Sequence, residues 1–441
     1  MKEWIRKIIP KPFLLLYHRT VVFLAAAYYG FPSDKMIVIG VTGTKGKTST
    51  TNFIADILEG AGYKVGVLST AQYRLPGKKW TNESKMTMPG RAKLQKFLRR
   101  AQKSECKYVV IETSSEGIAQ QRMTAISYDV AVFLNISPEH IESHGSFEKY
   151  QAAKEKLFKS LAKSKHKPNV PKISIVNLDD EKAQDFLKYD ADKKYGFTRH
   201  GRPALENMKS VAASNIHYEG KRVVFDLHVD GLQDKVEAPI PGLFNAENIL
   251  AAISVALSQD IRWEKVQQGI KNLKSVPGRL EFVDEGQPYK VIIDYAHEPK
   301  SLEAVLREAR ELSDGKVLVL TGSQGGGRDK QKRPKIGSVA HKYADFVVVT
   351  NEDPYDEDPA TIIQEVAEGI EDAGGDEDDD YIAVPARRDA IQKTLDRAQT
   401  GDVVVLAGKG SETVMAVAHD KKVPWSDREA VTEILKNLPS K

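Results

Sequence analysis

The stretch VTGTKGKTST, residues 41–50, sets the fold class of this chain of 441 residues. It follows the apolar run MIVIG and precedes TNFIADILEGAGYKVGVLST, whose apolar side chains recur at helical spacing. A strand, a glycine-rich loop and a helix in this order form a cradle for a nucleotide phosphate. The strict phosphate-loop pattern has a glycine five positions before the Gly-Lys pair, and Val41 occupies that position. We therefore expect a variant phosphate loop.

The residue types in this loop suit phosphate binding. Gly40, Gly43 and Gly46 allow the backbone to turn tightly, so that its N–H groups can face phosphate oxygens. Lys47 would reach the β- and γ-phosphates, and Thr48 would offer its hydroxyl to Mg²⁺. The candidate nucleotide-binding residues of the loop are Gly43, Thr44, Lys45, Gly46, Lys47, Thr48 and Ser49.

Apolar runs alternate with helical patterns on both sides of the loop. The runs MIVIGV, KVGVLS, YVVIET, DVAVFLN and ISIVN predict an α/β domain with a doubly wound, mostly parallel sheet. Residues 211–241 alternate as antiparallel hairpins do, which predicts a small antiparallel sheet. Beyond Pro277 and Gly278, four further runs ending in polar or glycine-rich turns predict a Rossmann-like domain. The expected parts are an N-terminal segment at 1–35, a central ATP-binding domain at 36–275 and a C-terminal domain at 276–441.

Length and composition favour a soluble enzyme of two or three domains. The formal net charge of +4 is small for this length and gives no reason to expect a nucleic-acid partner. The single Cys106 excludes an intramolecular disulfide framework and a cysteine-rich zinc site. It suits a reducing compartment, so we expect a cytoplasmic protein.

The first 30 residues, MKEWIRKIIPKPFLLLYHRTVVFLAAAYYG, are both basic and apolar. His18 and Arg19 interrupt the apolar run and leave about ten residues after them, too few to span a bilayer. We expect a retained segment. It is either a helix packed on the body of the protein or an interfacial helix that contacts a membrane or a partner.

Lys154 in SFEKYQAAKEKLF lies in the middle of an apolar helix face. On a helix this face carries Phe147, Tyr150, Gln151, Lys154, Leu157 and Phe158. One explanation is a lysine that snorkels to the edge of the face. The other is a desolvated, neutral amine that takes up CO₂ as a carbamate, which is an oxygen ligand suited to Mg²⁺.

Two further residues are candidate metal ligands at strand ends. Glu112 follows YVVI, where a carboxylate would contact Mg²⁺ directly or through water. His140 follows the next apolar run, in LNISPEHIESHG. A lone histidine is more often a structural hydrogen-bonding residue, and this alternative stays open for His140 and His144.

Taken together, these motifs resemble the Mur ligase family, and within it the branch that adds the third residue of the peptidoglycan stem peptide. The resemblance runs from Met36 to the C-terminus. It rests on GVTGTKGKTSTT, ETSSEGIAQQR, DVAVFLNISPEHIESHGSFEKYQAAKEKLF, NAENILAA, PGRLE, DYAHEP, GGGRDKQKRP, NEDP and GKGSE…SDRE. The family joins an amino acid to a UDP-muramoyl peptide in peptidoglycan biosynthesis, and so serves cell-wall formation, cell shape and division. It proceeds through an acyl phosphate and converts ATP to ADP and phosphate.

The resemblance also implies roles for single residues. Lys47 would stabilise the β- and γ-phosphates. Two Mg²⁺ ions are implied, one held by Thr48 and Glu112, the other by His140 and carbamylated Lys154. The implied catalytic residues are Lys47, Glu112, His140 and Lys154. The implied nucleotide contacts outside the loop are Asn248, Arg279, Asp294 and His297. The implied contacts to the UDP-muramoyl dipeptide are Thr87, Ser114, Gln120 and Arg122. The implied contacts to the incoming amino acid or the phosphates are Arg328, Asp353, Lys409 and Glu412.

Three departures from the family pattern shape the expectation. The family's N-terminal uridine-nucleotide domain is missing before residue 36, so the UDP part would be held weakly, by a partner chain, or not at all. The family's diaminopimelate-selecting Asp-Asn-Pro-Arg reads EDPY here. Tyr355 thus replaces an arginine that would clamp a second carboxylate, which favours lysine or a similar amine. Ser411 and Glu116 stand where histidine is common.

Two other functions remain open on the sequence. One is a ligase of the same fold with another acceptor, such as a folylpolyglutamate-like enzyme, which the missing domain favours. The other is a non-catalytic, membrane-associated ATP-binding module that uses residues 1–35. The SSEGIAQQR motif favours the muramoyl acceptor over the first. The joint presence of the catalytic residue types argues against the second.

Overall fold

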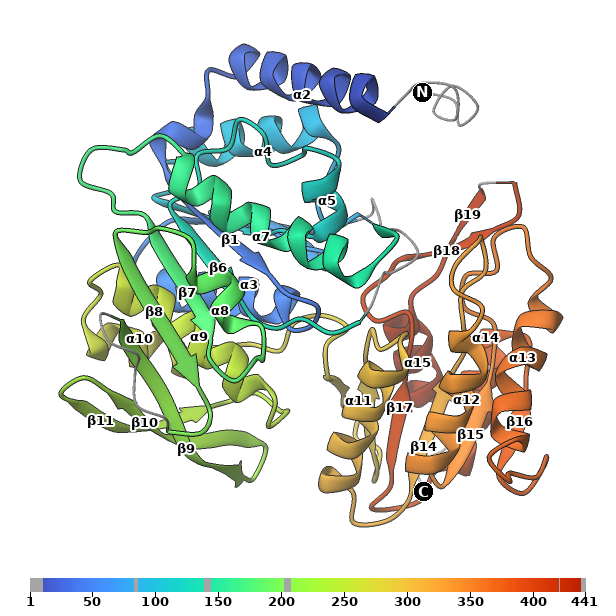
Figure 1. Cartoon of the computed structure of the whole chain (residues 1–441). Coiled ribbons are helices and arrows are strands. Elements are labelled where there is room, and N and C mark those ends of the chain that lie inside the picture. Colours follow the sequence, from blue (N-terminus) through green and yellow to red (C-terminus); the bar gives the residue numbers. More distant parts are fainter. Residues whose placement is uncertain (1–10, 83–85, 139–143, 202–207, 420, 438–441) are drawn as a thin grey trace. The chain divides into compact units, whose positions relative to one another are not determined.

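The chain folds into two compact units, Met1–Lys274 and Ser275–Lys441, which we call the N-terminal unit and the C-terminal unit. The computed structural model describes residues 11–82, 86–138, 144–201, 208–419 and 421–437. Both units are α/β structures built around a central sheet (Figure 1).

The N-terminal unit contains one large mixed sheet. Within the described residues its strands are, in spatial order, β11 (Leu232–Ala238), β10 (Arg222–Val229), β9 (Lys209–Glu219), β8 (Lys193–Thr198), β7 (Ile173–Asn177), β6 (Val130–Phe133), β1 (Ile37–Thr42), β5 (Tyr108–Glu112), β2 (Val65–Leu68), β3 (Gln72–Leu75) and β4 (Lys78–Thr81). The pairings from β9 through β2 are parallel, and those at both ends are antiparallel. The predicted doubly wound, mostly parallel sheet is confirmed. The antiparallel strands predicted at 211–241 continue this sheet, because β9 pairs with β8, and do not form a separate one.

Helices cover both faces of this sheet. The described helices of the unit are α2 (Lys11–Tyr28), the 3₁₀ helix η1 (Pro32–Lys35), α3 (Lys47–Gly60), α4 (Arg91–Lys103), α5 (Ser115–Ala119), α7 (Phe147–Lys163), α8 (Ala183–Leu187), α9 (Asn245–Ser258) and α10 (Trp263–Lys271). Helices α4, α7 and α8 contribute to one core with the strands, whereas α3 packs against α9. Strand β1 lies in the middle of the sheet and is buried along nearly its whole length. This explains why its sequence is continuously apolar rather than alternating.

A buried charge cluster supports the start of β1. The Asp129 carboxylate accepts a hydrogen bond from the Val38 backbone N–H at 2.9 Å. It also pairs with the ammonium groups of Lys167 and Lys172, the latter at 3.0 Å. All three charged side chains are buried, and burial lowers the pKa of Lys167. One carboxylate therefore compensates two buried ammonium groups beneath the strand that carries the glycine-rich loop.

Replacing Asp129 with asparagine is expected to lower the free energy of unfolding by about 3–5 kcal/mol, the usual cost of removing one partner from a buried ion pair. The substitution keeps the size of the side chain but leaves two buried ammonium groups uncompensated. Urea unfolding followed by circular dichroism measures the change. Glu219→Gln, which removes one partner of the exposed Glu219–Lys235 pair, is the control and should change little. A variant of Asp129 as stable as the wild type would contradict this account.

The C-terminal unit is a second, smaller α/β structure. Its main sheet contains, in spatial order, β12 (Glu281–Val283), β13 (Lys290–Ile293), β17 (Val403–Leu406), β14 (Val317–Thr321), β15 (Phe346–Val349) and β16 (Tyr381–Ala383). A separate hairpin is formed by β18 (Val414–Val417) and β19 (Lys421–Pro424). The helices described here are α11 (Pro299–Leu312), α12 (Lys332–Tyr343), α13 (Pro359–Glu371), α14 (Arg387–Arg397) and α15 (Asp427–Asn437). All strand pairs of the main sheet except β12–β13 are parallel.

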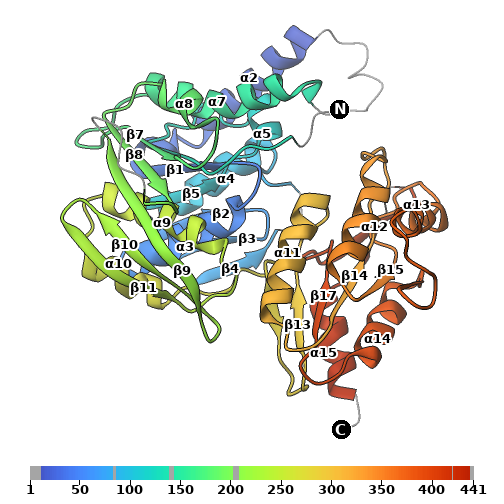
Figure 2. The ribbon, with the colours of Figure 1, turned by 60° about the horizontal axis from the view of Figure 1, so that its bottom comes forward.

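Helices cover both faces of this sheet (Figure 2), and an apolar core lies on each face. One is formed with α11, α12 and α13, and the other with α14 and α15. Strands β13, β14, β15 and β17 are therefore buried on both sides. Their carboxyl ends carry the polar and glycine-rich turns seen in the sequence, at the edge where open α/β sheets bind ligands. The predicted Rossmann-like architecture of this part is confirmed.

Candidate active site

The glycine-rich loop connects the carboxyl end of β1 to the first turn of α3. Gly46 has a φ of 78°, and a Cβ on it would lie 2.3 Å from Asn248 Oδ1, so a larger residue does not fit. The Asn135 side chain fixes the loop from outside by accepting hydrogen bonds from the backbone N–H groups of Thr44 (3.2 Å) and Lys45 (2.8 Å). Lys47 Nζ donates to the Thr44 carbonyl at 2.8 Å. The loop thus holds a lysine at a helix N-terminus, an arrangement suited to an anion.

The hydroxyl of Thr48 and the carboxylate of Glu112 meet beside this loop. Thr48 Oγ1 lies 3.1 Å from each carboxylate oxygen, and both residues are buried. They are adjacent because β1 and β5 are neighbouring parallel strands that end at the same edge. Thr70 also donates its backbone N–H to Glu112, at 2.6 Å, and its hydroxyl lies 2.9 Å from that of Thr87. Thr48 and Glu112 supply oxygen atoms of the kind that Mg²⁺ prefers, so they fit such an ion.

Lys154 points from α7 directly at the loop. Its Nζ donates to the Gly43 carbonyl at 2.6 Å and lies 4.4 Å from the centre of the Tyr150 ring. The Tyr150 hydroxyl in turn lies 3.0 Å from the hydroxyl of Thr44. Only 1% of Lys154 is exposed, which rules out the explanation that it snorkels to the edge of the helix face. A buried amine therefore lies against the candidate phosphate loop.

The two histidines considered as metal ligands differ in what can be said of them. His140 lies outside the described residues. His144 Nε2 lies 3.2 Å from Ser115 Oγ, and its ring makes an edge contact with Tyr150, as a structural histidine does. Within the part of the chain that the structure describes, no three His, Cys, Asp or Glu side chains are grouped to hold a metal.

The residues expected to contact a muramoyl peptide lie around α5, which directly follows β5 and Glu112. Ser114 caps α5 by accepting a hydrogen bond from the Gly117 N–H at 3.2 Å. The guanidinium of Arg122 donates to Gln120 Oε1 at 2.7 Å and also to the backbone carbonyl of Met88. The structure thus brings Gln120 and Arg122 together. Thr87 joins the same region through Thr70.

Asn248 lies against the loop rather than on the surface of α9. It is buried, its Oδ1 accepts from the Thr50 hydroxyl at 3.0 Å, and its Nδ2 donates to Asn245 Oδ1 at 2.8 Å. Together with the close approach to Gly46, these contacts support a role in shaping the loop.

Three predicted residues of the C-terminal unit gather where β12 begins and its antiparallel neighbour β13 ends. Asp294 accepts hydrogen bonds from the backbone N–H groups of Leu280 (2.7 Å) and Ala296 (2.8 Å), and its burial raises its pKa. The guanidinium carbon of Arg279 lies 4.5 Å from the centre of the Tyr295 ring. His297 Nδ1 donates to the carbonyl of Tyr295 at 2.7 Å. Burial, with a smaller effect of Lys332, lowers the pKa of His297 to about 3.

Replacing His297 with glutamine is expected to flatten the pH dependence of unfolding in mild acid. The folded chain keeps the ring neutral, whereas the unfolded ring has an ordinary pKa of about 6.5. Below that pH the unfolded state binds a proton that the folded state does not, so wild-type stability is lost as the pH falls towards 3. The contribution is at most about 1.4 kcal/mol per pH unit. It is smaller here because the side chain stays 24% exposed.

Urea unfolding at several pH values between 7 and about 5 measures this difference in slope. His166→Gln is the matched control because the His166 side chain is mostly exposed. Equal slopes for the wild type and the His297 variant would contradict the assignment of a partly buried, neutral ring.

Lys409 is the centre of a buried charge cluster at the carboxyl end of β17. Its Nζ lies 2.9 Å from Asp353 Oδ1 and 2.6 Å from Glu412 Oε2, and donates to the Val414 carbonyl at 2.8 Å. The structure therefore brings three of the four predicted residues together within this unit. Arg328, the fourth, is exposed on the glycine-rich turn after β14.

Sequence reasoning missed two residues next to this cluster. Glu352 is buried, accepts from Gln324 Nε2 at 2.9 Å, and has its pKa raised by burial. Arg387 is buried in a two-pronged ion pair with Asp427, at 2.8 and 2.7 Å. Glu352 and Asp427 belong to the motifs NEDP and SDRE, but the sequence motifs predicted no role for either residue. Nothing in the sequence pairs Asp427 with Arg387, which lies 40 residues away.

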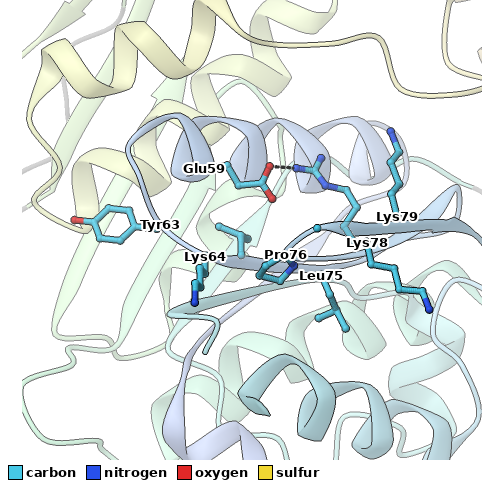
Figure 3. A pocket seen from close by; sticks show the side chains of 10 residues that line it. Glu59, Tyr63, Lys64, Leu75, Pro76, Lys78 and Lys79 are labelled. Atoms are coloured by element: carbon cyan, nitrogen blue, oxygen red, sulfur yellow. Dashed lines mark hydrogen bonds and ion pairs between the residues drawn. The ribbon is translucent and has the colours of Figure 1, made fainter. Parts of the chain in front are cut away.

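A hollow of about 390 Å³ opens beside the β3–β4 hairpin (Figure 3). Its lining includes Glu59, Lys64, Arg74 and Lys79, and so combines charges of both signs. Arg74 pairs with Glu59 and, at 2.6 Å, with Asp56. Its guanidinium is thus compensated within the protein, and none of the predicted site residues lines the hollow.

Comparison with known protein families matches each of the two units to a Mur ligase domain. Residues 41–256 match the family described as Mur ligase middle domain, and residues 278–410 match the family described as Mur ligase, glutamate ligase domain. The chain is 35% identical over 424 residues to UDP-N-acetylmuramoyl-L-alanyl-D-glutamate--2,6-diaminopimelate ligase 1 of Clostridium acetobutylicum. That match covers 95% of this chain and 82% of the relative.

Two further similarities agree. The UDP-N-acetylmuramyl-tripeptide synthetase of Roseiflexus sp. (strain RS-1) is 34% identical, over 94% of this chain and 81% of its own. A solved UDP-N-acetylmuramoyl-L-alanyl-D-glutamate--2,6-diaminopimelate ligase aligns with a TM-score of 0.61 and 27% identity, over 91% of this chain and 78% of its own. Where these names specify an amino acid, it is 2,6-diaminopimelate. They do not support lysine, which Tyr355 led us to expect.

Proposed function

Since this chain belongs to the Mur ligase family, we propose that it is an ATP-dependent enzyme that joins an amino acid to UDP-N-acetylmuramoyl-L-Ala-D-Glu. The observation that carries the proposal is the loop at 43–48, on which Lys47, Lys154 and the Thr48–Glu112 pair converge. The proposed reaction belongs to peptidoglycan biosynthesis. Because it consumes ATP, we place it in the cytoplasm.

The chemistry has to overcome the low reactivity of a carboxylate towards an amine. A carboxylate oxygen of the dipeptide attacks the γ-phosphorus of ATP, and the bond to the β,γ-bridging oxygen breaks to release ADP. The amine of the incoming amino acid then attacks the acyl carbon of the acyl phosphate. The C–O bond breaks, phosphate leaves with one oxygen of the original carboxylate, and the amine nitrogen loses a proton. Positioning and charge stabilisation supply most of the rate enhancement in such transfers.

In this proposal, different residues of the N-terminal unit stabilise the phosphate charge, hold Mg²⁺ and orient the acceptor. Backbone N–H groups at the start of α3 and the Lys47 ammonium stabilise the negative charge that builds up between the β- and γ-phosphates. Thr48 and Glu112 would hold Mg²⁺, which neutralises phosphate charge when bound. Gln120 and Arg122, close to Glu112 in the chain, would orient the acceptor.

Lys154 has a more specific proposed role. We propose that its amine carries a carbamate and that this group and His140 hold a second Mg²⁺. The burial of Nζ beside Gly43 and Tyr150 supports a lysine that is not simply a solvated cation. Burial favours the neutral amine, which is the form that reacts with CO₂.

The cluster around Lys409 is the proposed site for the incoming amino acid. A buried ammonium group can bind a carboxylate, while Asp353 and Glu412 can bind an amine. Diaminopimelate, named for the relatives, is the first amino acid to test. Tyr355 offers no guanidinium to a second carboxylate, so the choice among amino acids needs direct measurement.

The test is ATP-dependent phosphate release with UDP-muramoyl dipeptide and, separately, diaminopimelate, lysine, ornithine and glutamate, with product masses recorded. The proposal predicts phosphate release and a new amide product with one of these amino acids. No product with any of them, under conditions in which the chain binds ATP, would overturn the proposed acceptor. Glutamate added to a folate substrate instead would assign the chain to the folylpolyglutamate-like alternative.

A further inference from the structure

Helix α2 presents a large apolar face to solvent. Phe13, Leu16, Phe23, Leu24 and Tyr28 are 66%, 62%, 52%, 61% and 83% exposed, respectively. Successive members are three, seven, one and four positions apart, which at 3.6 residues per turn places all five on one side of the helix. Scattered exposed apolar residues are ordinary, but a continuous stripe of large ones marks an interaction surface. We call these five residues the α2 stripe.

The opposite side of α2 is fixed to the N-terminal unit. His18, Val22 and Ala26 are buried, and α2 packs along α4 (Figure 1). The helix is therefore apolar on both sides, although such a helix is normally buried all round. Its inner side packs on the protein, and the described residues leave the α2 stripe exposed.

Basic side chains border the α2 stripe. A hollow of about 560 Å³ is lined by Arg19, Phe23 and Leu24 of α2 together with Lys163, the last residue of α7, and Lys165 just after it. Cationic and apolar groups thus meet in one surface feature. Asp34 also lines this hollow and pairs with Lys165 at 3.2 Å, but Arg19 and Lys163 add further positive charge.

The helix beneath α2 is strongly basic as well. The sequence of α4, RAKLQKFLRRAQK, contains six basic residues and no acidic residue. Lys93, Lys96, Arg100 and Lys103 are exposed. The segment MKEWIRKIIP, which precedes α2 in the sequence, adds three basic residues and one acidic residue. The sequence around the α2 stripe therefore carries a clear excess of positive charge.

We propose that α2 is an interfacial anchor that binds the surface of a membrane containing anionic lipids. Large apolar side chains would enter the boundary between headgroups and acyl chains, while the neighbouring lysines and arginines pair with lipid phosphates. A second copy of this chain is the poorer occupant, because pairing two α2 stripes would bring two basic borders together. Among the described residues no helix has the length and apolarity to cross a membrane, so the proposed contact is with the surface only.

Co-sedimentation of the full-length chain with lipid vesicles tests the proposal. The probes are vesicles of phosphatidylcholine alone and vesicles in which about 30% of the lipid is phosphatidylglycerol. We expect binding to the anionic vesicles to be at least about tenfold tighter than to the neutral ones, and to weaken as salt is raised. Equal binding to both, or none to the anionic vesicles, would overturn the proposal.

Two variants separate the apolar and the electrostatic contributions. Phe23→Ser/Leu24→Ser and Arg19→Glu/Lys163→Glu should each weaken binding to anionic vesicles by roughly tenfold or more. The matched controls are Val423→Ser, an exposed apolar residue of β19, and Lys265→Glu/Lys271→Glu on α10. They should bind like the wild type.

Folding and self-association are read separately from lipid binding. The α2 variants should retain the wild-type thermal unfolding temperature and, without vesicles, the wild-type ATP turnover, because the four substituted side chains are exposed and lie outside the proposed active site. A dimer in size-exclusion chromatography that the variants abolish, with no vesicle binding by the wild type, would assign the stripe to a second copy. That result would overturn the membrane proposal and leave the proposed function intact.

Discussion

Replacing Lys47 with alanine is expected to lower ligase turnover by roughly a thousandfold. Lys47 is the first residue of α3, and its ammonium lies over the loop, 2.8 Å from the Thr44 carbonyl. The loop geometry places the Lys47 ammonium at the helix N-terminus, where we expect the phosphate to bind. Negative charge between the β- and γ-phosphates grows as the acyl phosphate forms. Loss of the Lys47 ammonium is therefore expected to lower kcat. The measurement is the initial rate of ADP formation with all substrates saturating.

A conservative variant and a control variant accompany this measurement. Lys47→Arg keeps the charge but changes its shape and should retain part of the activity. Lys64→Ala removes a lysine from an exposed pair with Glu105 and should leave turnover unchanged. Normal turnover by Lys47→Ala would contradict the assignment of a phosphate loop.

Replacing Lys154 with alanine is expected to leave the enzyme nearly inactive, with partial rescue by a short-chain carboxylic acid such as acetate. The substitution removes the amine that lies 2.6 Å from the Gly43 carbonyl and opens a space beside Tyr150. A small carboxylate that enters this space would replace the oxygen atoms of the proposed carbamate. The measurement is turnover of the variant as a function of added acetate, with chloride at the same ionic strength as the reference.

Lys156→Ala is the matched control, because Lys156 lies on the same helix but is exposed. It should be fully active and insensitive to acetate. Full activity of Lys154→Ala without any addition would rule out a catalytic role for this residue. An inactive variant that binds ATP normally but is not rescued would favour an unmodified ammonium acting through the loop.

The local parts of this structure were predictable from the sequence. The apolar run at 36–40 and the glycines after it specify a strand and a tight turn, because few other conformations suit them. The sequence places Lys154 in the middle of an apolar helix face but does not show whether its amine is exposed or buried. In the structure the amine is buried and directed at Gly43.

The parts that failed or were missed depend on contacts between distant residues. Asn248 was singled out as a nucleotide contact, but its contacts with Gly46 and Thr50, which lie 198 positions or more before it, were not predicted. Asn135 accepts from Thr44 and Lys45 across 90 or more positions. Such contacts carry no local signal, because the sequence around an asparagine does not show which distant backbone or side chain it meets. The same holds for Arg387 with Asp427.

The joining of β9 to β8 is a third example. Alternation within 211–241 predicts antiparallel pairing of these strands with one another, and β10 does pair with β9 and β11 in this way. The alternation does not reveal that β9 also pairs with β8. That choice depends on the edge of the parallel sheet left open at β8, which is a property of the assembled unit.

The most direct test of the central claim is the fate of a labelled oxygen. Both carboxylates of the D-glutamate in UDP-muramoyl dipeptide are prepared with oxygen-18, and the released phosphate is analysed by mass spectrometry after one round of amide formation. The account predicts that each phosphate carries one labelled oxygen, because the carboxylate attacks the γ-phosphorus and the C–O bond breaks later. Amide formation with unlabelled phosphate would contradict the acyl-phosphate route and the active site proposed for it.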